Sequence, residues 1–425
     1  MKEIPYWTDM APEFPDRAGR PLPGRVDVAV VGGGITGLHA AIRLARKGAS
    51  TVVLEQGRFA SGASGRNGGM CTTGLSVGPA TAIKRYGLAA ARVYYDAYRE
   101  AVDFVESAVR AEGIDCDFRR AGRLGVAFKP SHHAHQRATQ KLLAELFNHE
   151  TFLIGPSELR TEIGSTAYHG ALLDPLSAGL HPGKYVRGLA DAAERAGAGL
   201  HENLKVTGVR RETGGRFQIG TARGSVSARQ VLLATDAYTT SVFPALQRRM
   251  VVVGSFIVVT EPLGETLAGE IIPRGRMVVD TKNIGHYYRL TTDNRLVFGG
   301  RARFALSNPG SDRKSGRILR RDMLAIFPQL IKVQIEYAWG GHVGFPADRM
   351  PHAGEMGGLY YSMGYSGHGV QMASYMGARM AEVMDGHPEA NPWRELKAVP
   401  FPTYSGTAWF LPFVGAYYGI KDRLG

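Results

Sequence analysis

The sequence predicts an α/β fold in which a dinucleotide-binding domain is interleaved with a β-rich domain. Near the N-terminus a strand-like segment, Val26–Val31, leads through a glycine-rich turn into a helical pattern that ends at Lys47. A second strand-like segment follows at Thr51–Leu54, which completes a βαβ unit. Between residues 251 and 304 the chain changes to β-branched and aromatic segments separated by turns. The length of 425 residues is enough for two or three domains.

The first helix is expected over Gly37–Lys47, with Gly48 as its stop signal. Its apolar residues recur at helical spacing on one face: Leu38, Ala41, Ile42 and Ala45. Further helical patterns cover 88–112, 135–148, 184–196, 313–327 and 369–384. Strand patterns cover 204–210, 216–220, 231–235 and 359–363, and a hairpin turn is expected at Thr291–Asn294.

The composition excludes several classes of protein. The 51 Lys and Arg against 38 Asp and Glu give a net charge of +13, but the basic residues are scattered, so we expect no nucleic-acid partner. A basic cleft that attracts an anionic substrate is the second interpretation. The two cysteines, Cys71 and Cys116, form no CxxC pair, so no cysteine-based metal site is expected and a cytoplasmic location fits.

No membrane span is expected, because no run of about 18 apolar residues occurs. The N-terminus also has no apolar signal segment. The most apolar segment is Phe401–Ile420, which carries two prolines and three glycines that would break a membrane helix. We expect this C-terminal tail, 396–425, to be packed on the protein, with contact to a membrane surface as the alternative. The sequence carries no signal for an oligomeric state.

The glycine-rich turn has the pattern of a Rossmann-type phosphate site. Gly32, Gly34 and Gly37 form G-x-G-x-x-G directly after a strand and at the start of a helix, so the backbone can approach a pyrophosphate at the helix N-terminus. Glu55 ends the second strand, where its carboxylate accepts from a ribose hydroxyl and repels a 2′-phosphate. The turn therefore predicts FAD or NAD, and not NADP.

The segment that follows separates the two cofactors. In "GASGRNGG", Gly62–Gly69, small residues allow a flat group to lie against the backbone, and Arg66 and Asn67 can donate to it. With "PYWTDMAP" (5–12), "VLLATDAY" (231–238), "YYRLTTDNRLVFGG" (287–300), "WGGHVGFPADRMPHAG" (339–354) and "GYSGHGVQMASYMGARMAE" (364–382), the chain resembles the FAD-dependent D-amino acid oxidase, glycine oxidase and sarcosine oxidase family. Within that family it is most similar to the bacterial γ-glutamylputrescine oxidase type.

The resemblance implies a fold and a set of FAD contacts. The FAD-binding domain would comprise 26–85, 160–245 and 335–395, in the glutathione-reductase-like arrangement, and the substrate domain 86–159 and 246–334. Besides the glycine turn and Glu55, the residues expected at FAD are Ser64, Arg66, Asn67, Gly68, Val206, Gly341, Gly367, His368, Gly369 and Val370. The N-terminus of the helix at Gly369 would favour negative charge on the flavin.

Two departures from sarcosine oxidases change what is expected. Where those enzymes carry a flavin-linking cysteine this chain has Gly340–Gly341, so we expect non-covalent FAD. Where they carry an oxygen-activating lysine it has Val297, and where a second lysine binds the substrate carboxylate it has Gln371, which we place at the substrate. Oxygen activation and anion binding must then use other groups.

The substrate face is expected in the β-rich segment. His286 and Tyr288 alternate with Tyr287 and Arg289, so one pair faces inward, and we expect His286 and Tyr288 at the flavin as catalytic candidates beside His368. Tyr288 is also expected at the substrate. Arg301 follows the strand and is the candidate for an anionic substrate group.

The predicted reaction is oxidation of an amine or amino acid C–N bond to an imine, by hydride transfer to flavin N5. The substrate would be a small amine that also bears an anionic group, and oxygen or another acceptor would take the electrons. Two alternatives stay open. One is a D-amino acid or hydroxy-acid dehydrogenase that uses a non-oxygen acceptor, and the other is a flavin-fold protein that acts on tRNA.

Overall fold

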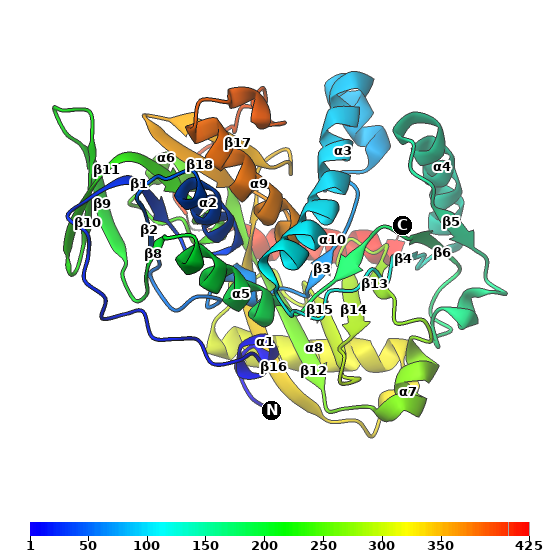
Figure 1. The fold of residues 1–425 in the computed structure, drawn as a ribbon. Coiled ribbons are helices and arrows are strands. Elements are labelled where there is room, and N and C mark those ends of the chain that lie inside the picture. Colours follow the sequence, from blue (N-terminus) through cyan, green and yellow to red (C-terminus); the bar gives the residue numbers. More distant parts are fainter. Residues whose placement is uncertain (407, 425) are drawn as a thin grey trace.

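The computed structural model describes residues 1–406 and 408–424, and these build two eight-stranded sheets with helices on their outer faces (Figure 1). A third sheet is a short antiparallel pair, β3 (Met70–Cys71) with β7 (Ala178–Gly179). Short 3-10 helices occur at η1 (Ala63–Gly65), η2 (Leu159–Thr161), η3 (Asp236–Tyr238), η4 (Pro328–Leu330) and η5 (Pro388–Ala390). The predicted α/β architecture is confirmed.

The first sheet holds the dinucleotide-type unit in the order β17-β18-β11-β1-β2-β8, with β10 paired to β11 and β9 paired to β10. Strands β18, β11, β1, β2 and β8 run parallel. The bounds are β1 (Arg25–Val31), β2 (Thr51–Leu54), β8 (Gly199–His201), β9 (Val206–Arg211), β10 (Phe217–Thr221), β11 (Gly224–Leu233), β17 (His352–Met356) and β18 (Leu359–Met363). Both faces of the central strand are buried, which explains the unbroken apolar run in its sequence.

The βαβ unit lies where the glycine pattern predicts it. Strand β1 leads into α2 (Ile35–Arg46), which returns to β2. Gly32 has φ +106°, a conformation that favours glycine, and this lets the chain turn tightly from β1 into α2. A Cβ on Gly37 would lie 2.0 Å from the Gly32 carbonyl oxygen, so only glycine lets the helix pack so close to the strand.

Helices α2, α3, α5 and α9 cover one face of this sheet and share its largest apolar core. The bounds are α3 (Pro79–Glu112), α5 (Pro182–Arg195) and α9 (Gly369–Met384). Helix α3 begins earlier than the predicted 88, because Pro79 starts a helical segment that is interrupted at Gly87, where φ is 78°. Helix α4 (Pro130–Phe147) packs against α3 and against β5 and β6 of the second sheet, and the short α6 (Pro244–Gln247) precedes β12.

The second sheet has the order β16-β12-β15-β14-β13-β4-β6-β5 and is antiparallel except for the β13–β4 pair. Its bounds are β4 (Arg123–Val126), β5 (Phe152–Ile154), β6 (Ala171–Asp174), β12 (Val251–Thr260), β13 (Met277–Asp280), β14 (His286–Leu290), β15 (Leu296–Gly300) and β16 (Ile335–Phe345). Helix α8 (Pro309–Ile326) packs on one face of it, and α7 (Gly264–Ile271) lies at its end (Figure 1). Strands β6 and β16 belong to this sheet, although the expected boundaries put both in the FAD-binding domain.

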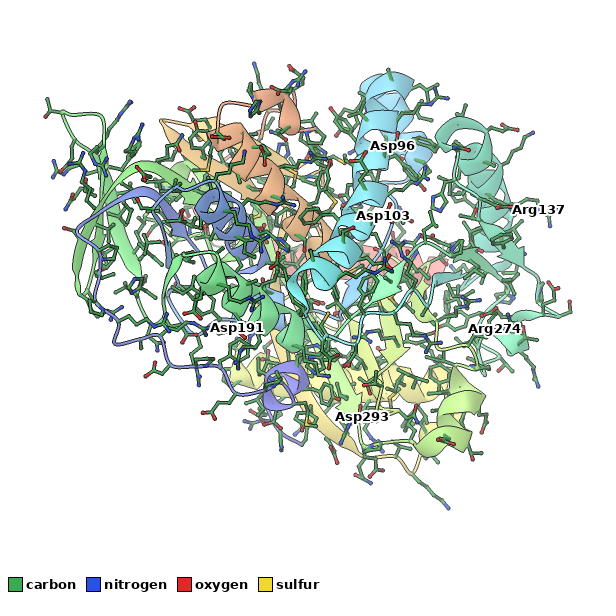
Figure 2. All side chains as sticks on the ribbon, in the orientation of Figure 1. Asp96, Asp103, Arg137, Asp191, Arg274 and Asp293 are labelled. Carbon is green, nitrogen blue, oxygen red and sulfur yellow. The ribbon has the colours of Figure 1, made fainter. Side chains whose placement is uncertain are left out.

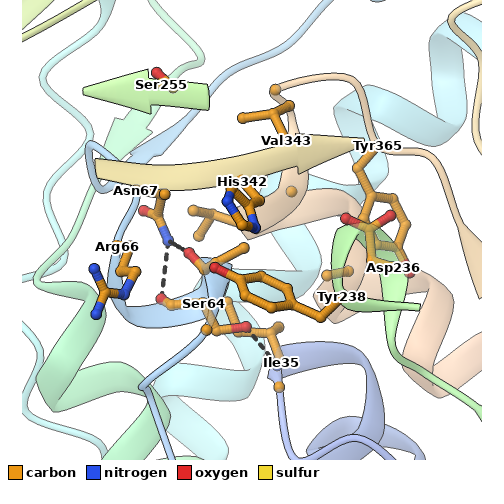
Figure 3. A pocket seen from close by; sticks show the side chains of 18 of the residues that line it. Ile35, Ser64, Arg66, Asn67, Asp236, Tyr238, Ser255, His342, Val343 and Tyr365 are labelled. Atoms are coloured by element: carbon orange, nitrogen blue, oxygen red, sulfur yellow. Dashed lines mark hydrogen bonds between the residues drawn. The ribbon is translucent and has the colours of Figure 1, made fainter. Parts of the chain in front are cut away.

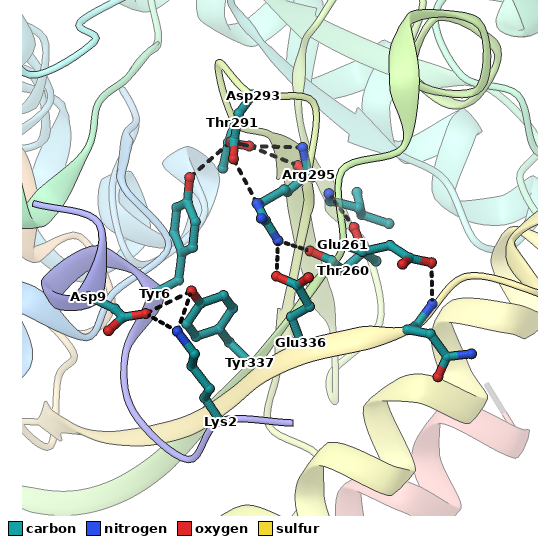
Figure 4. Close-up of polar contacts among 12 residues, drawn as sticks. Lys2, Tyr6, Asp9, Thr260, Glu261, Thr291, Asp293, Arg295, Glu336 and Tyr337 are labelled. Carbon is teal, nitrogen blue, oxygen red and sulfur yellow. Dashed lines mark hydrogen bonds and ion pairs between the residues drawn. The ribbon is translucent and has the colours of Figure 1, made fainter.

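The predicted hairpin at 291–294 is confirmed, and the N-terminal segment packs against it (Figure 4). Thr291 and Asp293 hydrogen bond across the turn at 2.5 Å. The Tyr6 hydroxyl, from α1 (Tyr6–Asp9), donates to Asp293 at 2.9 Å. The neighbouring Trp7 donates from Nε1 to the Asn67 carbonyl oxygen at 2.7 Å. Residues 5–9 thus tie the second sheet to the loop that follows β2.

The C-terminal tail is packed on β12, as expected. Tyr404 and Leu411 form a small apolar core with Val251 and Val253, and α10 (Leu411–Leu424) follows. Within residues 1–406 and 408–424, no helix is long and apolar enough to cross a bilayer. Charged side chains of both signs surround the molecule: the labelled Asp103 on α3 pairs with Arg120, and Asp191 on α5 pairs with Arg17 (Figure 2).

Candidate active site

A cavity of about 720 Å³ is lined by residues of both large sheets. The glycine turn, the loop after β2 and the N-terminus of α9 contribute from the first sheet, and β12, β13, β14, β16 and Arg301 just past β15 contribute from the second. Its volume lies within the range of small-molecule sites, about 300–1,000 Å³. The cavity therefore gathers segments that are more than 300 residues apart in the sequence.

The glycine turn forms one end of the cavity. Gly32, Gly34 and Glu55 line it, as does Val206 at the start of β9. The Glu55 Oε2 accepts from the Gly33 N–H at 2.7 Å, and Oε1 accepts from the Gly57 N–H at 2.9 Å. Burial raises the pKa of Glu55, while these backbone hydrogen bonds act in the opposite direction. Its carboxylate is thus oriented by the backbone and keeps lone pairs for a further donor.

Polar side chains of the loop after β2 bind backbone groups of the loop itself, of α2 and of β16 (Figure 3). Ser64 Oγ accepts from the Ile35 N–H at 3.0 Å, and Asn67 donates to the Ser64 carbonyl oxygen at 2.9 Å. Arg66 donates to the Ser61 and Gly340 carbonyl oxygens at 2.7 and 2.8 Å. Ser64, Arg66 and Asn67 line the cavity, as does Gly68, but the guanidinium and the amide are engaged in holding the loop.

The N-terminus of α9 forms the opposite wall, where Gly367, His368, Gly369 and Val370 line the cavity. The His368 ring lies edge-on to Tyr98, with 5.5 Å between ring centroids, and its Nδ1 is 3.3 Å from Ser76 Oγ. Burial lowers the pKa of His368 to about 4. The imidazole is therefore neutral at pH 7 and weakly basic, which disfavours it as a general base.

On β14 the cavity is lined by His286, as expected, and by Tyr287 in place of Tyr288. Tyr288 is fully buried on the α8 side, where its hydroxyl bonds to Tyr168 at 2.8 Å and its ring stacks on Phe298. Tyr287 faces the cavity instead, and its hydroxyl is 3.1 Å from Ser255 Oγ. The expectation that Tyr288 faces the cavity is wrong, because alternation along a strand leaves open which face meets the other domain.

The other member of the expected pair, His286, lies at the margin of the cavity. Its Nδ1 is 3.0 Å from Asp280, and its Nε2 is 3.3 Å from Asp322 on α8. Burial disfavours the imidazolium, but the two carboxylates outweigh it and raise the pKa of His286. Both ring nitrogens are engaged by carboxylates, so His286 holds β14 against α8.

Arg289, which alternates with Tyr288 along β14, holds the loop that follows β2. Its Nε donates to the Gly68 carbonyl oxygen at 2.8 Å, and NH2 donates to Leu180 at 2.6 Å. Burial lowers the pKa of this guanidinium to about 10. The loop at Gly68 is therefore fixed from the side opposite to the cavity.

Arg301 lines the cavity just past β15, as the sequence predicts. Its guanidinium carbon lies 4.9 Å from the Phe345 ring centroid. No carboxylate in the described part of the chain lies within 4 Å of it. Burial, and then the charge of Arg349, lower its pKa. Arg349 also lines the cavity and donates to the Ser76 carbonyl oxygen at 2.6 Å. The two guanidinium groups make this part of the wall electropositive.

Gln371 does not lie where it was expected. Its side chain is fully buried in α9 behind the cavity wall, and its amide donates to the Thr72 carbonyl oxygen at 2.6 Å. It does not line the cavity, because successive side chains of a helix point in different directions: Val370 and Ala373 face the cavity, whereas Gln371 faces Thr72, next to β3. Gln371 therefore supports the wall and does not contact what the cavity holds.

Comparison with known proteins identifies the family. Residues 27–383 match the model of the DAO family, described as FAD dependent oxidoreductase. The gamma-glutamylputrescine oxidoreductase of Escherichia coli K12 is 36% identical over 405 residues, which is 94% of this chain and 93% of that protein. The chain belongs to the DAO family of FAD-dependent oxidoreductases. The predicted membership is thereby confirmed.

Solved structures of DAO-family oxidases share the fold. The glycine oxidase from Geobacillus kaustophilus superposes with a TM-score of 0.73 at 19% identity, covering 91% of this chain and 99% of the other. The L-amino acid deaminase from Proteus myxofaciens, solved with anthranilate, also gives 0.73 at 19% identity, covering 93% and 95%. At these identities the likeness concerns the fold alone.

The cavity of this DAO-family chain fits FAD. The His342 Nε2 atom is buried with no hydrogen-bond partner among the described residues, and the ring lies in the cavity beside Tyr238, 5.2 Å between centroids (Figure 3). Such an orphaned polar atom calls for a partner that the protein chain does not supply. Cys71 and Cys116 are buried elsewhere and line no part of the cavity.

Sequence reasoning missed several lining residues. Tyr287, His342 and Arg349 stand at the cavity, as do Asp236 and Tyr418. Asp236 has φ 38°, and its Oδ1 accepts from the Gly364 N–H at 2.7 Å, which joins β11 to the loop before α9. A weak signal for Asp236 exists, since "ATDAY" follows a strand that is parallel to the glycine-turn strand. The sequence gives no signal for Tyr418, because only the tertiary fold brings α10 to the cavity.

Proposed function

We propose that this protein oxidises the C–N single bond of an amine that also bears an anionic group. When bound, FAD would accept at N5 the hydride that leaves the α-carbon, while the nitrogen lone pair forms the C=N bond, and water would then hydrolyse the imine. The oxidoreductase class follows from the family. The amine class is supported by relatives named gamma-glutamylputrescine oxidoreductase and glycine oxidase.

The single observation that carries the anionic group is Arg301. A guanidinium that lies in a cavity with no carboxylate partner among the described residues has its donors available for a ligand. Its fork geometry can bind a carboxylate through two parallel hydrogen bonds, and Arg349 adds positive charge beside it. An amine without an anionic group would leave the buried Arg301 guanidinium without a partner, which is unfavourable.

The residues expected at FAD remain our proposed cofactor site. Glu55 would accept from the adenosine ribose, and the glycine turn would meet the pyrophosphate. The Arg66–Gly68 loop, Gly341 and the Gly367–Val370 turn would border the flavin. No cysteine lines the cavity, which supports non-covalent binding. The division into an FAD-binding and a substrate domain is also proposed, with β6 and β16 assigned to the substrate domain.

The chain would position the substrate and need not supply a catalytic base. His368 is held neutral and weakly basic, so we place it at the flavin edge. Tyr287 would close the cavity over the reacting carbon through its bond to Ser255. Once the amine has lost its proton, alignment of the α-carbon near the flavin and exclusion of water suffice for hydride transfer.

Anaerobic mixing of the FAD-loaded protein with a panel of amines tests the proposal. Amines that carry a carboxylate should bleach the flavin absorbance, and hydroxy acids of similar size should not. Bleaching by hydroxy acids alone would overturn the amine assignment, and dithionite reduction controls for a competent flavin. Admitting oxygen then separates an oxidase, which releases hydrogen peroxide steadily, from a dehydrogenase that needs another acceptor.

A further inference from the structure

Helix α10 has two apolar faces, and only the inner one is packed. On the inner face Tyr418 stacks on Phe304, with 6.1 Å between centroids, and also lines the cavity. A Cβ on Gly415 would meet the Phe304 ring at 2.9 Å, so the helix lies directly on that ring. The Asp422 carboxylate accepts from the Asn283 and Ile284 N–H groups at 2.9 and 2.8 Å. These contacts fix the helix on the second sheet.

The outer face carries four large apolar side chains in solvent. They are Trp409 (70% exposed), Phe413 (70%), Tyr417 (61%) and Ile420 (56%). Phe413, Tyr417 and Ile420 lie four and three residues apart, on one side of α10. Trp409 lies in the turn just before the helix, and we call the four residues the outer stripe. Trp7, Trp339 and Trp393 are each at most 1% exposed, so Trp409 is the one tryptophan of this chain that lies at the surface.

One exposed lysine follows the outer stripe at the C-terminal end of α10, and a second lysine, which lines the cavity, lies near the same end. Lys421 follows Ile420 and is exposed. The bonds from Asn283 and Ile284 to Asp422 bring Lys282 beside the same end of the helix. The Lys282 ammonium lies 3.8 Å from the Phe128 ring centroid, next to Lys129 in the chain. Asp422, the nearby acid, is engaged with backbone N–H groups, and the whole chain carries a charge of +13.

We infer that the outer stripe docks on the surface of an anionic lipid bilayer. Tryptophan and tyrosine are the side chains that suit the boundary between headgroups and acyl chains, and flanking lysines add attraction to anionic headgroups. The four side chains expose an area on the order of 500 Å². A stable protein–protein interface needs about 800 Å² on each partner, so a flat bilayer is the better match for this narrow stripe.

The orientation that follows has a consequence for the cavity. Tyr418 lies on the inner side of the helix whose outer side would contact lipid. In a docked molecule, the cavity wall formed by Tyr418 would therefore lie between the bilayer and the second sheet. This inference does not rest on the identity of the substrate.

The experiment uses the FAD-loaded protein and two kinds of vesicle, phosphatidylcholine alone and phosphatidylcholine mixed with phosphatidylglycerol. Flotation should recover the protein with the anionic vesicles and not with the neutral ones. Acrylamide should quench Trp409 in free protein and should quench it less with anionic vesicles present. The double variant Phe413→Ser/Tyr417→Ser should partition at least about 10-fold less, because two aromatic side chains no longer enter the bilayer. Ile331→Ser, at an apolar residue 60% exposed on another face, should bind as the parent does.

Three results would overturn the inference. One is the absence of flotation with folded, FAD-loaded protein. Another is flotation that is undiminished in the double variant or leaves Trp409 quenching unchanged, since charge alone would then explain binding. The third is self-association that depends on the stripe without any binding to vesicles, since a second copy would then be its occupant. FAD content and thermal midpoint, measured for each variant, show that the fold is retained.

Discussion

The Glu55 Oε2 atom accepts a hydrogen bond from the Gly33 N–H at 2.7 Å, which joins the end of β2 to the glycine turn after β1. This contact orients the carboxylate toward the place where the adenosine ribose would lie. Glu55→Ala should weaken FAD binding about 10- to 100-fold, because a charge-assisted hydrogen bond contributes about 1.5–3 kcal/mol. Titration of apoprotein with FAD, followed by flavin fluorescence, measures the change. Glu13→Ala, at an exposed carboxylate, is the matched control, and equal affinities in the two variants would remove Glu55 from the ribose site.

Arg301 should decide how the enzyme treats charged and uncharged amines. Arg301→Ala should raise KM for an amine that bears a carboxylate by about 100-fold and leave a plain alkylamine almost unchanged, since a hydrogen bond to a charged group is worth about 1.5–3 kcal/mol. Arg301→Lys keeps the positive charge but cannot form two parallel hydrogen bonds, so its KM for the same amine should lie between those of the parent and Arg301→Ala. Arg317→Ala, on the exposed face of α8, should match the parent. If both substrates suffer equally, or neither does, Arg301 is not the anion site.

The two neighbouring tyrosines of β14 should behave differently. Tyr288→Phe removes a hydroxyl that bonds to Tyr168 in the core, so it should lower the free energy of unfolding by about 1 kcal/mol and leave steady-state kinetics intact. Tyr287→Phe removes the bond to Ser255 at the cavity and should lower kcat/KM about fivefold with little change in stability. Urea unfolding and amine turnover on the same samples separate these effects. A loss of turnover in Tyr288→Phe, with turnover retained in Tyr287→Phe, would show that Tyr288 and not Tyr287 acts at the cavity.

FAD should be released by denaturation. The two cysteines lie away from the cavity, although three histidines, His286, His342 and His368, line it. Acid precipitation should leave the yellow absorbance in the supernatant, as expected for non-covalent binding. Colour that stays in the pellet would show a covalent link, and mass spectrometry of the pellet would then locate the residue.

Stability should fall on the acid side because buried histidines are held neutral. Burial lowers the pKa of His39 to about 3 and that of His181 and His368 to about 4, against about 6.5 when unfolded. Between those values the unfolded chain binds more protons, so the free energy of unfolding decreases as pH falls from about 7 to 4. At pH 5 each such histidine removes on the order of 2 kcal/mol.

Urea unfolding at pH 7 and pH 5 measures this loss. His39→Gln should reduce the difference between the two pH values, and His387→Gln, at an exposed histidine, should not. His286 acts in the opposite direction, because its raised pKa adds stability at low pH that is lost as pH rises. A slope that is the same in parent and His39→Gln would show that His39 is not the source.

Local sequence patterns were sufficient for the nucleotide-binding half of the molecule. The spacing of Gly32, Gly34 and Gly37 after an apolar strand determines a tight turn, and the position of Glu55 follows from the length of the crossover helix. The βαβ unit, the hairpin at 291–294 and α9 depend on contacts between residues close in the chain. Such elements can be predicted because turn chemistry and helical periodicity act over a few residues.

Only the tertiary structure decided which side chains of the second sheet and of α9 line the cavity. Alternation along β14 separates Tyr287 from Tyr288, but which of them meets the cavity depends on the side where α8 packs, and α8 is distant in sequence. Gln371 follows the Gly367–Val370 turn closely and yet points away from the cavity, because helical rotation and not sequence distance sets its direction. Arg301, Arg349 and Tyr418 meet at one cavity because long-range packing brings their separate elements together. The sequence by itself thus determined the dinucleotide-binding fold and the family, whereas the packing of the two sheets decided which side chains of the second sheet line the cavity.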